Sequence, residues 1–412
     1  MKKLSKDFLR KLRVIVLVGI AVYVALLCWI CHTKFNNYGY DDFDLAIDAQ
    51  STWNILHGSI ISSIHGIPFL GNHMRLILFL VAPIYAFFCS PLLLLYLQTF
   101  ALGTAAWGIY LIAKHELPER WAVILGLVYL VYPPLIYLNL YEFHPVAFVV
   151  PFLIYMFYFY KTERFALYTI FFLLAMACQE NIPLIAIAFA VYAFIDGKRG
   201  RWVFVPLITG LLYFCLCVFI LMPHFNKGTI QFYNLYGSFG GSIPEIVKNI
   251  IVHPVKTAKI MFSSEKLIFL SSLLGPLGYL SLLSPLNLLP ALPVLFQRLL
   301  SLRPSESTIV YHYQAEFIPF IFIAAIFAVR KALTFKHRIT RKALTIILIF
   351  FPLASILATG VVVRIVHDIK NGFAENFLNS RKDALLSKIA DDASVLATFE
   401  FQPIISIQDD VI

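Results

Sequence analysis

The segment VIVLVGIAVYVALLCWIC, Val14–Cys31, contains no charged residue and decides the class of fold. A helix that crosses a bilayer needs about 20 apolar residues, so this segment predicts a first membrane span. It lacks a small-residue cleavage site, which favours a retained span over a removed signal peptide. Basic residues favour the cytoplasmic side of a membrane, so the N-terminus is predicted to be cytoplasmic. The basic residues before the span are Lys2, Lys3, Lys6, Arg10, Lys11 and Arg13.

The composition of the whole chain agrees with a multi-pass membrane protein. Of its 412 residues, 60% are hydrophobic and 14% are charged, and the mean hydropathy is +0.80. Soluble domains carry roughly 25% charged residues. The net charge of +10 predicts a topology signal and contact with membrane lipids. No nucleic acid partner is expected, because no basic stripe with interleaved aromatic residues appears outside the membrane-flanking loops. The six cysteines predict neither a disulfide framework nor a zinc site.

The apolar runs predict an all-α polytopic fold with about eleven transmembrane helices. The uncharged run Leu76–Ala113 is too long for one span. It is either two spans, or an interfacial helix at Leu76–Phe88 followed by one span. The second interpretation places the later basic loops on the cytoplasmic side and is preferred. The predicted spans are 14–31, 91–113, 121–139, 145–160, 165–179, 182–195, 202–222, 267–283, 286–300, 315–330 and 343–363.

These spans predict one transmembrane domain at residues 1–363 and a short extracytoplasmic tail at 364–412. The first outer loop is 32–90, and a second large outer segment is 223–266. The predicted location is the cell (inner) membrane, with the N-terminus in the cytoplasm and the functional face outside.

An acidic stretch, YDDFDLAIDAQ at Tyr40–Gln50, follows the first span on the predicted outer side. It holds four of the chain's 23 acidic residues: Asp41, Asp42, Asp44 and Asp48. Carboxylates beside a membrane are costly to desolvate, so a cluster of them usually has a function. The alternative is a solvated acidic loop, because runs of charge often have no further role.

Other unusual polar residues collect on the same predicted side. Glu142 and His144 lie two residues apart, and an acid and an imidazole at that spacing can share a proton or a cation. For the single histidines the alternative is an ordinary interfacial residue, and for Glu180 it is a charge favoured by a helix N-terminus. The predicted substrate-binding residues are His144, His73, Glu180, Arg298, Arg303 and His312.

Three kinds of chemistry fit these side chains. A carboxylate can act as a general base for a hydroxyl acceptor, and Arg298 or Arg303 can neutralise a leaving phosphate. Oxygen ligands can hold a hard divalent cation, Mg²⁺ or Mn²⁺; the candidate metal ligands are Asp42, Asp44, Glu142 and His144. The chain has no P-loop, no Gly-rich dinucleotide motif and no Gly-x-Ser-x-Gly elbow, so soluble nucleotide chemistry is not predicted.

Several motifs, in this order, resemble one family. They are Phe43–Gln50 with Trp53 and Gly58, Asn72-His73, Ala82-Pro83, Glu142–Pro145, Gln179–Asn181 and His312-Tyr313. They resemble the bacterial and archaeal predicted multi-pass membrane proteins catalogued as domain of unknown function 2079, over roughly residues 35–400. That family is similar to the GT-C superfamily, whose integral membrane glycosyltransferases use polyprenyl-phosphate sugars on the extracytoplasmic side.

The resemblance implies a GT-C-like enzyme with interfacial helices after the first span. It implies Asp44 as the catalytic carboxylate, Asp42 as its neighbour and Glu142 as the second acidic position. A hexose or pentose would pass from a lipid-phosphate-linked sugar donor to an extracytoplasmic acceptor, which is a glycolipid, a glycan or a protein. Two alternatives stay open: a transporter or flippase of lipid-linked or small polar substrates, and a non-catalytic membrane protein.

The chain departs from the family pattern at three places. Glu142 stands where the family usually has Asp, which keeps the carboxylate. Gln179 and Asn181 stand where it usually has Lys and Asp, which removes two charges. The chain ends soon after Ala397-Thr398, so the resemblance predicts a truncated tail.

Overall fold

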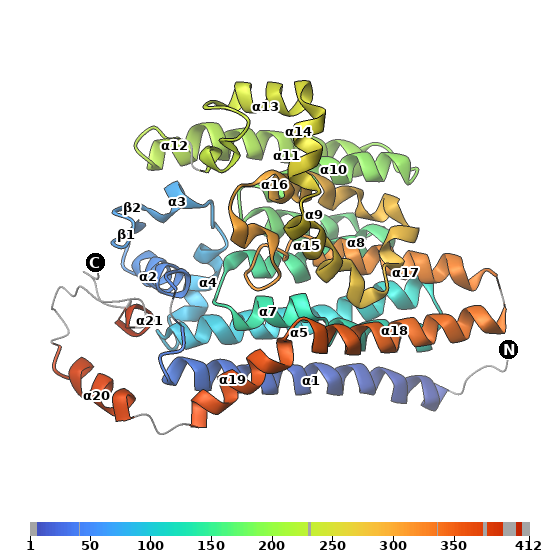
Figure 1. Ribbon diagram of the computed structural model, residues 1–412, viewed down its shortest axis with the longest axis horizontal. Helices are drawn as coiled ribbons and strands as arrows, with labels where there is room; N and C mark the ends of the chain where they lie inside the picture. Colours follow the sequence, from blue (N-terminus) through green and yellow to red (C-terminus); the bar gives the residue numbers. More distant parts are fainter. Residues whose placement is uncertain are drawn as a thin grey trace.

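The computed structural model describes residues 6–40, 42–229, 232–335, 337–373, 377–389 and 401–405. Helices form nearly all the regular structure of these residues, so the predicted all-α class is confirmed. Most long helices lie along the long axis of the molecule (Figure 1). A hairpin of two-residue strands, β1 (Ile61–Ser62) and β2 (Ile67–Pro68), is antiparallel, with Ile61 opposite Pro68.

The first half of the chain builds the bundle and a small cap at one of its ends. The bundle helices are α1 (Lys6–Asn36), α5 (Pro91–Glu116), α6 (Glu119–Leu130), α7 (Pro133–Leu140), α8 (Val149–Lys161), α9 (Phe165–Met176), α10 (Ile182–Ile195) and α11 (Arg201–Leu216). The cap consists of the β-hairpin with α2 (Asp44–Leu56), α3 (Phe69–Asn72) and α4 (Leu78–Tyr85). Figure 1 shows the cap beside the end of α1 that leads into α2.

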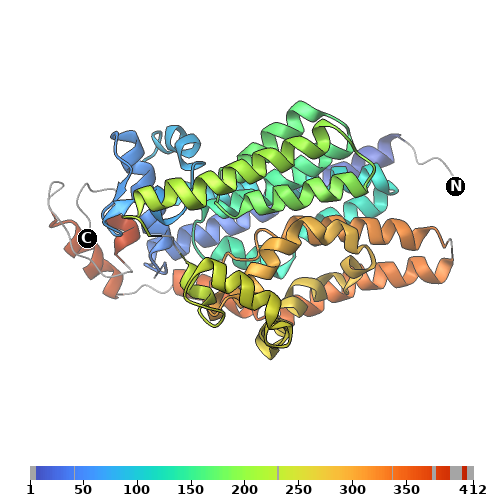
Figure 2. The same cartoon turned by 90° about the horizontal axis from the view of Figure 1, so that it is seen from above.

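The second half continues past the π-helical turn Cys217–Leu221 at the end of α11. Its helices are α12 (Met222–Phe225), α13 (Ile243–Val252), α14 (Pro254–Met261), α15 (Ser264–Leu274), α16 (Leu292–Leu300), α17 (Ile318–Leu333), α18 (Arg338–Ala358), α19 (Val361–Phe373), α20 (Phe377–Leu386) and α21 (Gln402–Ile405). Figure 2 shows α10 and α11 along one side of the bundle and α17 and α18 along the other.

The core runs through α17, whose residues from Ile318 to Val329 are all buried. This helix packs against α5 and α8, and α1 packs against α5, α6 and α19. By contrast α11 and α18 are mostly exposed within the protein, since only 17% of each apolar window is buried. Apolar surface of this kind is expected where helices contact lipid.

Among the residues that the structure describes, four to six candidate spans are found by length and composition, in place of the predicted eleven. The four long apolar helices are Lys11–Asn36, Pro91–Glu116, Arg201–Phe225 and Arg338–Ala358. Two bent pairs raise the number to six if each is one broken span: Glu119–Leu130 with Pro133–Leu140, bent by 41°, and Pro254–Met261 with Ser264–Leu277, bent by 56°. The shorter apolar helices are Pro145–Lys161, Phe165–Met176 and Ile182–Ile195.

Proline accounts for the largest differences from the predicted spans. The segments predicted as spans 267–283 and 286–300 contain 3₁₀ turns at Gly275–Leu277, Leu280–Leu283 and Pro285–Ala291. Proline lacks the N–H that an α-helix interior requires, and Pro276 and Pro290 lie in these turns. Helix α4 has eight residues, about 12 Å at 1.5 Å per residue, which is too short to cross a bilayer.

The two ends of the bundle differ in their charges. The turns at one end carry ion pairs, which include Arg13–Glu119, Lys114–Glu119, Arg330–Glu116, Lys161–Asp196 and Lys198–Glu163. The other end holds the cap, and α20 and α21 lie beside it (Figure 1). The predicted separation of basic turns from the acidic stretch is therefore present, and the assignment of these ends to cytoplasm and exterior stays a prediction.

The described part of the tail contacts the cap. Helix α21 packs on α2, and the rings of Phe401 and Tyr38 meet edge to face with centroids 5.6 Å apart. The Tyr38 hydroxyl donates a hydrogen bond to Asp383 Oδ1 at 2.5 Å. Ala397-Thr398, where the truncation was predicted, lies outside the described residues.

Gly71 allows α3 to approach the end of α12 closely. A Cβ atom at this position would lie 2.7 Å from the carbonyl oxygen of Phe225. We expect Gly71→Ala to lower the free energy of unfolding by about 1–3 kcal/mol, because overpacking forces the backbone to shift. The thermal unfolding midpoint in detergent measures this. Gly241→Ala is the control, since nothing lies within 4 Å of its Cβ position; equal midpoints for the two variants would contradict the prediction.

Candidate functional site

Glu142 fixes the start of α2, the helix that carries the acidic stretch. The N-cap residue of α2, Phe43, makes no side-chain cap. Instead, the Glu142 carboxylate accepts hydrogen bonds from the backbone N–H groups of Asp42 at 3.1 Å and Leu45 at 2.7 Å. A carboxylate at a helix N-terminus satisfies unpaired N–H groups and the helix dipole. Burial and the charge of Asp44 nevertheless raise the pKa of Glu142 well above its ordinary value.

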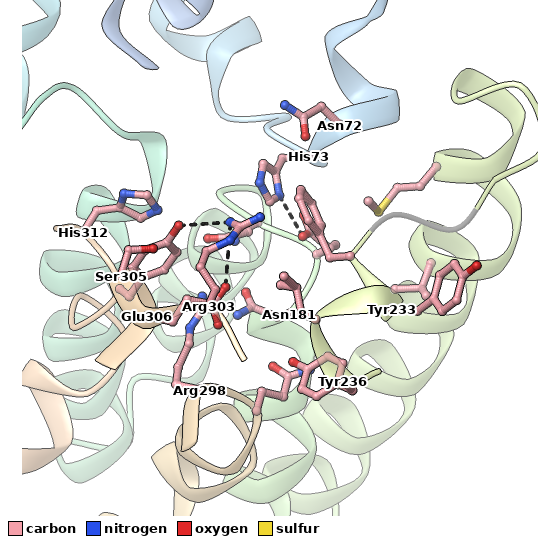
Figure 3. Close-up of a pocket in the computed structure, with 18 of the residues that line it drawn as sticks. Asn72, His73, Asn181, Tyr233, Tyr236, Arg298, Arg303, Ser305, Glu306 and His312 are labelled. Carbon is pink, nitrogen blue, oxygen red and sulfur yellow. Dashed lines mark hydrogen bonds and ion pairs between the residues drawn. The ribbon is translucent and has the colours of Figure 1, made fainter. Parts of the chain in front are cut away.

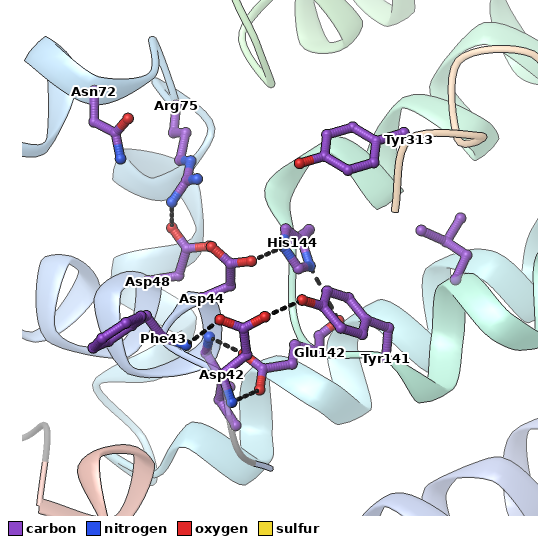
Figure 4. A network of polar contacts seen from close by, with 12 residues as sticks. Asp42, Phe43, Asp44, Asp48, Asn72, Arg75, Tyr141, Glu142, His144 and Tyr313 are labelled. Carbon is purple, nitrogen blue, oxygen red and sulfur yellow. Dashed lines mark hydrogen bonds and ion pairs between the residues drawn. The ribbon is translucent and has the colours of Figure 1, made fainter. Parts of the chain in front are cut away.

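Asp44 and His144 form the centre of the site (Figure 4). His144 Nε2 lies 2.8 Å from Asp44 Oδ2, the imidazole is 2% exposed and the carboxylate is 26% exposed. Burial raises the pKa of Asp44, but the charge of His144 and its hydrogen bond outweigh burial and hold that pKa well below the ordinary value. The exposed face of an ionised carboxylate is therefore available to a ligand.

Three polar side chains that sequence reasoning missed hold the 141–144 turn. The Gln98 side chain donates to Glu142 O and accepts from the His144 N–H, both at 2.9 Å. Lys34 Nζ donates to the carbonyl oxygen of Leu140 at 3.0 Å. The Tyr141 hydroxyl donates to Asp42 Oδ2. A signal for Gln98 exists in the sequence, because it is an amide within an uncharged apolar run.

His312 joins this centre from the segment that precedes α17. Its ring stacks on that of His144, with centroids 3.7 Å apart and an interplanar angle of 25°. Burial lowers the pKa of His312 well below its ordinary value, and the neighbouring His144 adds to the effect. The ring is therefore neutral at pH 7.

Ion pairs connect the remaining cap residues to the bundle. Arg75 NH1 lies 2.6 Å from Asp48 Oδ1 in the buried interior of the cap. His73 Nδ1 lies 2.8 Å from Glu180 Oε1, and Glu180 Oε2 accepts the Met74 N–H at 3.1 Å. Burial raises the pKa of Glu180, yet His73 and backbone N–H donors lower it overall.

The two arginines predicted to bind phosphate occupy different environments. Arg298 is buried, 2.9 Å from Glu316 and 3.3 Å from Glu306. Arg303 is 38% exposed and lies 3.9 Å from Glu306; its guanidinium donates to the Tyr313 hydroxyl at 3.3 Å. Arg303 is thus the more accessible cation of the two.

A cavity of about 970 Å³ joins most of these groups. Figure 3 shows His312, Arg303 and Glu306 facing it from one side and His73 and Asn72 from another. Asp42 and Asp44 also line it, whereas Glu142 and His144 stand behind them. Its apolar wall comes from α11, its π-helical turn, α13 and α16: Phe214, Val218, Phe219, Ile246, Val247, Ile250, Phe296 and Leu300.

The predicted site residues are therefore gathered into one region, with distinct positions. Asp44 faces the cavity, His144 and Glu142 support it, and His312 lies beside it. Of the candidate metal ligands, Asp42 is engaged by Tyr141 and the Phe43 N–H, and Glu142 by the start of α2. Asp41 lies outside the described residues.

A bundle of long apolar helices, with a cavity near one end that has a polar part and an apolar wall, defines a predominantly helical membrane protein. Residues 36–412 match the family described as predicted membrane protein (DUF2079). Because the match covers most of the sequence, the chain belongs to this family, and the resemblance inferred from its motifs is confirmed. No curated protein matches the sequence.

Proposed function

We propose that the protein is a GT-C-like glycosyltransferase that moves a sugar from a polyprenyl-phosphate donor to an acceptor hydroxyl. One observation carries the proposal. The cavity has a polar end that contains the ionised Asp44 and an accessible Arg303, and it continues along apolar walls beside the lipid-exposed helix α11.

The apolar wall suits the isoprenoid part of such a donor. Val218 and Phe219 from the π-helical turn after α11 and Val247 from α13 line the cavity. Phe219 and Val247 are also more than half exposed, so the cavity wall is continuous with surface that a lipid tail can follow. Burial of a chain along this wall contributes about 25 cal/mol per Å² of apolar area.

The polar end suits the phosphate. Arg75 is neutralised by Asp48, and Arg298 by two glutamates. Among the described residues, Arg303 has only the distant Glu306 as a charged partner within 4 Å, so its guanidinium can donate charge-assisted hydrogen bonds to phosphate oxygens. The donor head would thus lie between Arg303 and Asp44.

Asp44 would act as the general base in a single displacement. The acceptor oxygen forms a bond to the anomeric carbon as its proton passes to Asp44, and the bond from that carbon to the phosphate oxygen breaks. The electron pair leaves on polyprenyl phosphate, whose charge Arg303 stabilises. An acceptor hydroxyl becomes more acidic as its bond forms, so a carboxylate of low pKa can still take the proton. The outcome is inversion at the anomeric carbon.

A transporter, the main alternative, binds its substrate near the middle of the membrane. The described residues that line the cavity include none from the charged turns at the far end, such as Glu116, Glu119 or Asp196. This distribution favours an enzyme that works from one face.

The test is transfer by the purified full-length protein. Radiolabelled polyprenyl-phosphate hexoses and pentoses are supplied with a lipid and glycan extract as acceptor, and release of polyprenyl phosphate is measured. Labelled product and released lipid phosphate are expected with one donor class. If no donor is consumed and polyprenyl phosphate does not bind, the proposal is wrong.

Arg303→Ala is expected to raise the KM for the donor by roughly 10- to 100-fold, because a hydrogen bond to a charged group contributes about 1.5–3 kcal/mol. Donor titration with the transfer assay measures this. Arg330→Ala is the matched control, since Arg330 pairs with Glu116 at the opposite end of the bundle. An unchanged KM in Arg303→Ala would remove Arg303 from the phosphate site.

A further inference from the structure

We infer that Asp44, His144 and His312 form a binding site for a divalent transition-metal ion such as Zn²⁺ or Mn²⁺. Among the residues that the structure describes, these three form the group whose potential ligand atoms all lie within 4.8 Å of one another. They come from three separate segments: the start of α2, the turn after α7 and the segment before α17. Sequence spacing alone could not assemble them.

The donor set decides the kind of metal. Two imidazole nitrogens with one carboxylate oxygen suit Zn²⁺, Mn²⁺ and related ions, whereas Mg²⁺ prefers oxygen ligands throughout. The oxygen-rich set predicted from the sequence stays a prediction; within it, Asp42 and Glu142 accept hydrogen bonds from the backbone or from Tyr141. The inferred set keeps Asp44 and His144 and adds His312.

The two histidines carry features expected of ligands. His312 Nδ1 is buried and has no hydrogen-bond partner in the described structure, and an unpaired buried polar atom is costly unless something binds it. His144 Nδ1 lies 3.4 Å from the carbonyl oxygen of Glu142. A ring nitrogen that faces a backbone carbonyl orients the other nitrogen towards a metal.

The site is also placed to use the ion. Asp44 and His312 line the cavity while His144 lies behind them, so three protein ligands would leave open positions towards the cavity. Catalytic zinc sites have this arrangement, with three protein ligands and one position for water or substrate. The ion would polarise a phosphate oxygen of the donor; this catalytic use rests on the function proposed above, whereas metal binding itself does not.

The test measures metal content in the full-length protein. Purified protein is stripped with EDTA, dialysed against ZnCl₂, MnCl₂ or MgCl₂, and analysed by mass spectrometry of the elements; cobalt absorption gives a second signal. We expect stoichiometric Zn²⁺ or Mn²⁺ but no retained Mg²⁺. Removing a direct ligand in His312→Ala should weaken affinity by more than the 10- to 100-fold typical of outer-shell partners.

His65→Ala is the matched control, because His65 lines the same cavity but lies outside the cluster. Its metal content should stay at the wild-type level. Asp44→Asn is a second ligand variant in case His312→Ala does not fold, and monodispersity in detergent verifies each protein. Folded wild type without metal, or metal content at the wild-type level in both ligand variants, overturns the inference. Sugar transfer by the EDTA-stripped protein would refute the catalytic use of the ion but keep the transferase. Bound metal without sugar transfer would keep the metal site but refute the transferase.

Discussion

Asp44→Asn is expected to lower the turnover number for sugar transfer by about 10²- to 10⁴-fold, the range that general base catalysis contributes. The substitution keeps the shape of the side chain, but an amide cannot accept the acceptor's proton. The carboxylate is 26% exposed and faces the cavity, so its loss should affect chemistry more than folding. The transfer assay under saturating donor measures the effect.

Asp196→Asn provides the matched control for this substitution. Asp196 is a carboxylate that pairs with Lys161 at the opposite end of the bundle, and the same change there should leave turnover near the wild-type value. If Asp44→Asn and Asp196→Asn both turn over at the wild-type rate, Asp44 is not the base. Because Asp44 is also an inferred metal ligand, metal content is measured on the same sample to separate the two roles.

The sequence predicted the helical membrane class well but the continuity of its helices poorly. Apolar length alone identifies α1, α5, α11 and α18, since each is long and apolar enough to cross a bilayer. It fails between 267 and 300, where Pro276, Pro285 and Pro290 convert apolar sequence into 3₁₀ turns. The hydropathy of the segment 267–300 is compatible with lipid. The prolines, however, lack the N–H groups that a continuous α-helix requires.

The proximity of the predicted site residues was anticipated better than the contacts that each of them makes. Motifs far apart in the sequence indicated that Asp44, Glu142 and His144 belong together, and they are in contact. Glu142 caps α2 because the turn after α7 directs its side chain towards the start of that helix. The spacing of the residues in the sequence does not show this direction. Likewise, the supporting contacts of Gln98 exist only because α5 passes beneath the turn. Contacts of this kind depend on tertiary packing and leave no local pattern in the sequence.

Arg298 illustrates the same limit and gives a second prediction of large effect. The sequence presented it as a phosphate ligand equivalent to Arg303, but the structure pairs it with Glu316 and Glu306 in the interior. Breaking a buried ion pair by removing one partner typically costs about 3–5 kcal/mol. We expect Arg298→Leu to lower the free energy of unfolding by that amount, measured as the unfolding midpoint in detergent. Arg303→Ala, which removes a partly exposed arginine, should change stability far less.

The pH dependence of Arg298→Leu distinguishes an uncompensated charge from simple loss of packing. Burial raises the pKa of Glu316 above its ordinary 4.5 even though Arg298 opposes the shift, and without the arginine that pKa should rise further. A folded state that binds more protons than the unfolded state loses stability as pH rises. The loss of unfolding free energy caused by Arg298→Leu should therefore grow as the pH rises above the folded-state pKa of Glu316 in the wild type. Glu316→Gln combined with Arg298→Leu should remove much of this growth, because the amide has no charge to leave unpaired. If the loss of unfolding free energy in Arg298→Leu does not change with pH, the guanidinium contributes packing alone.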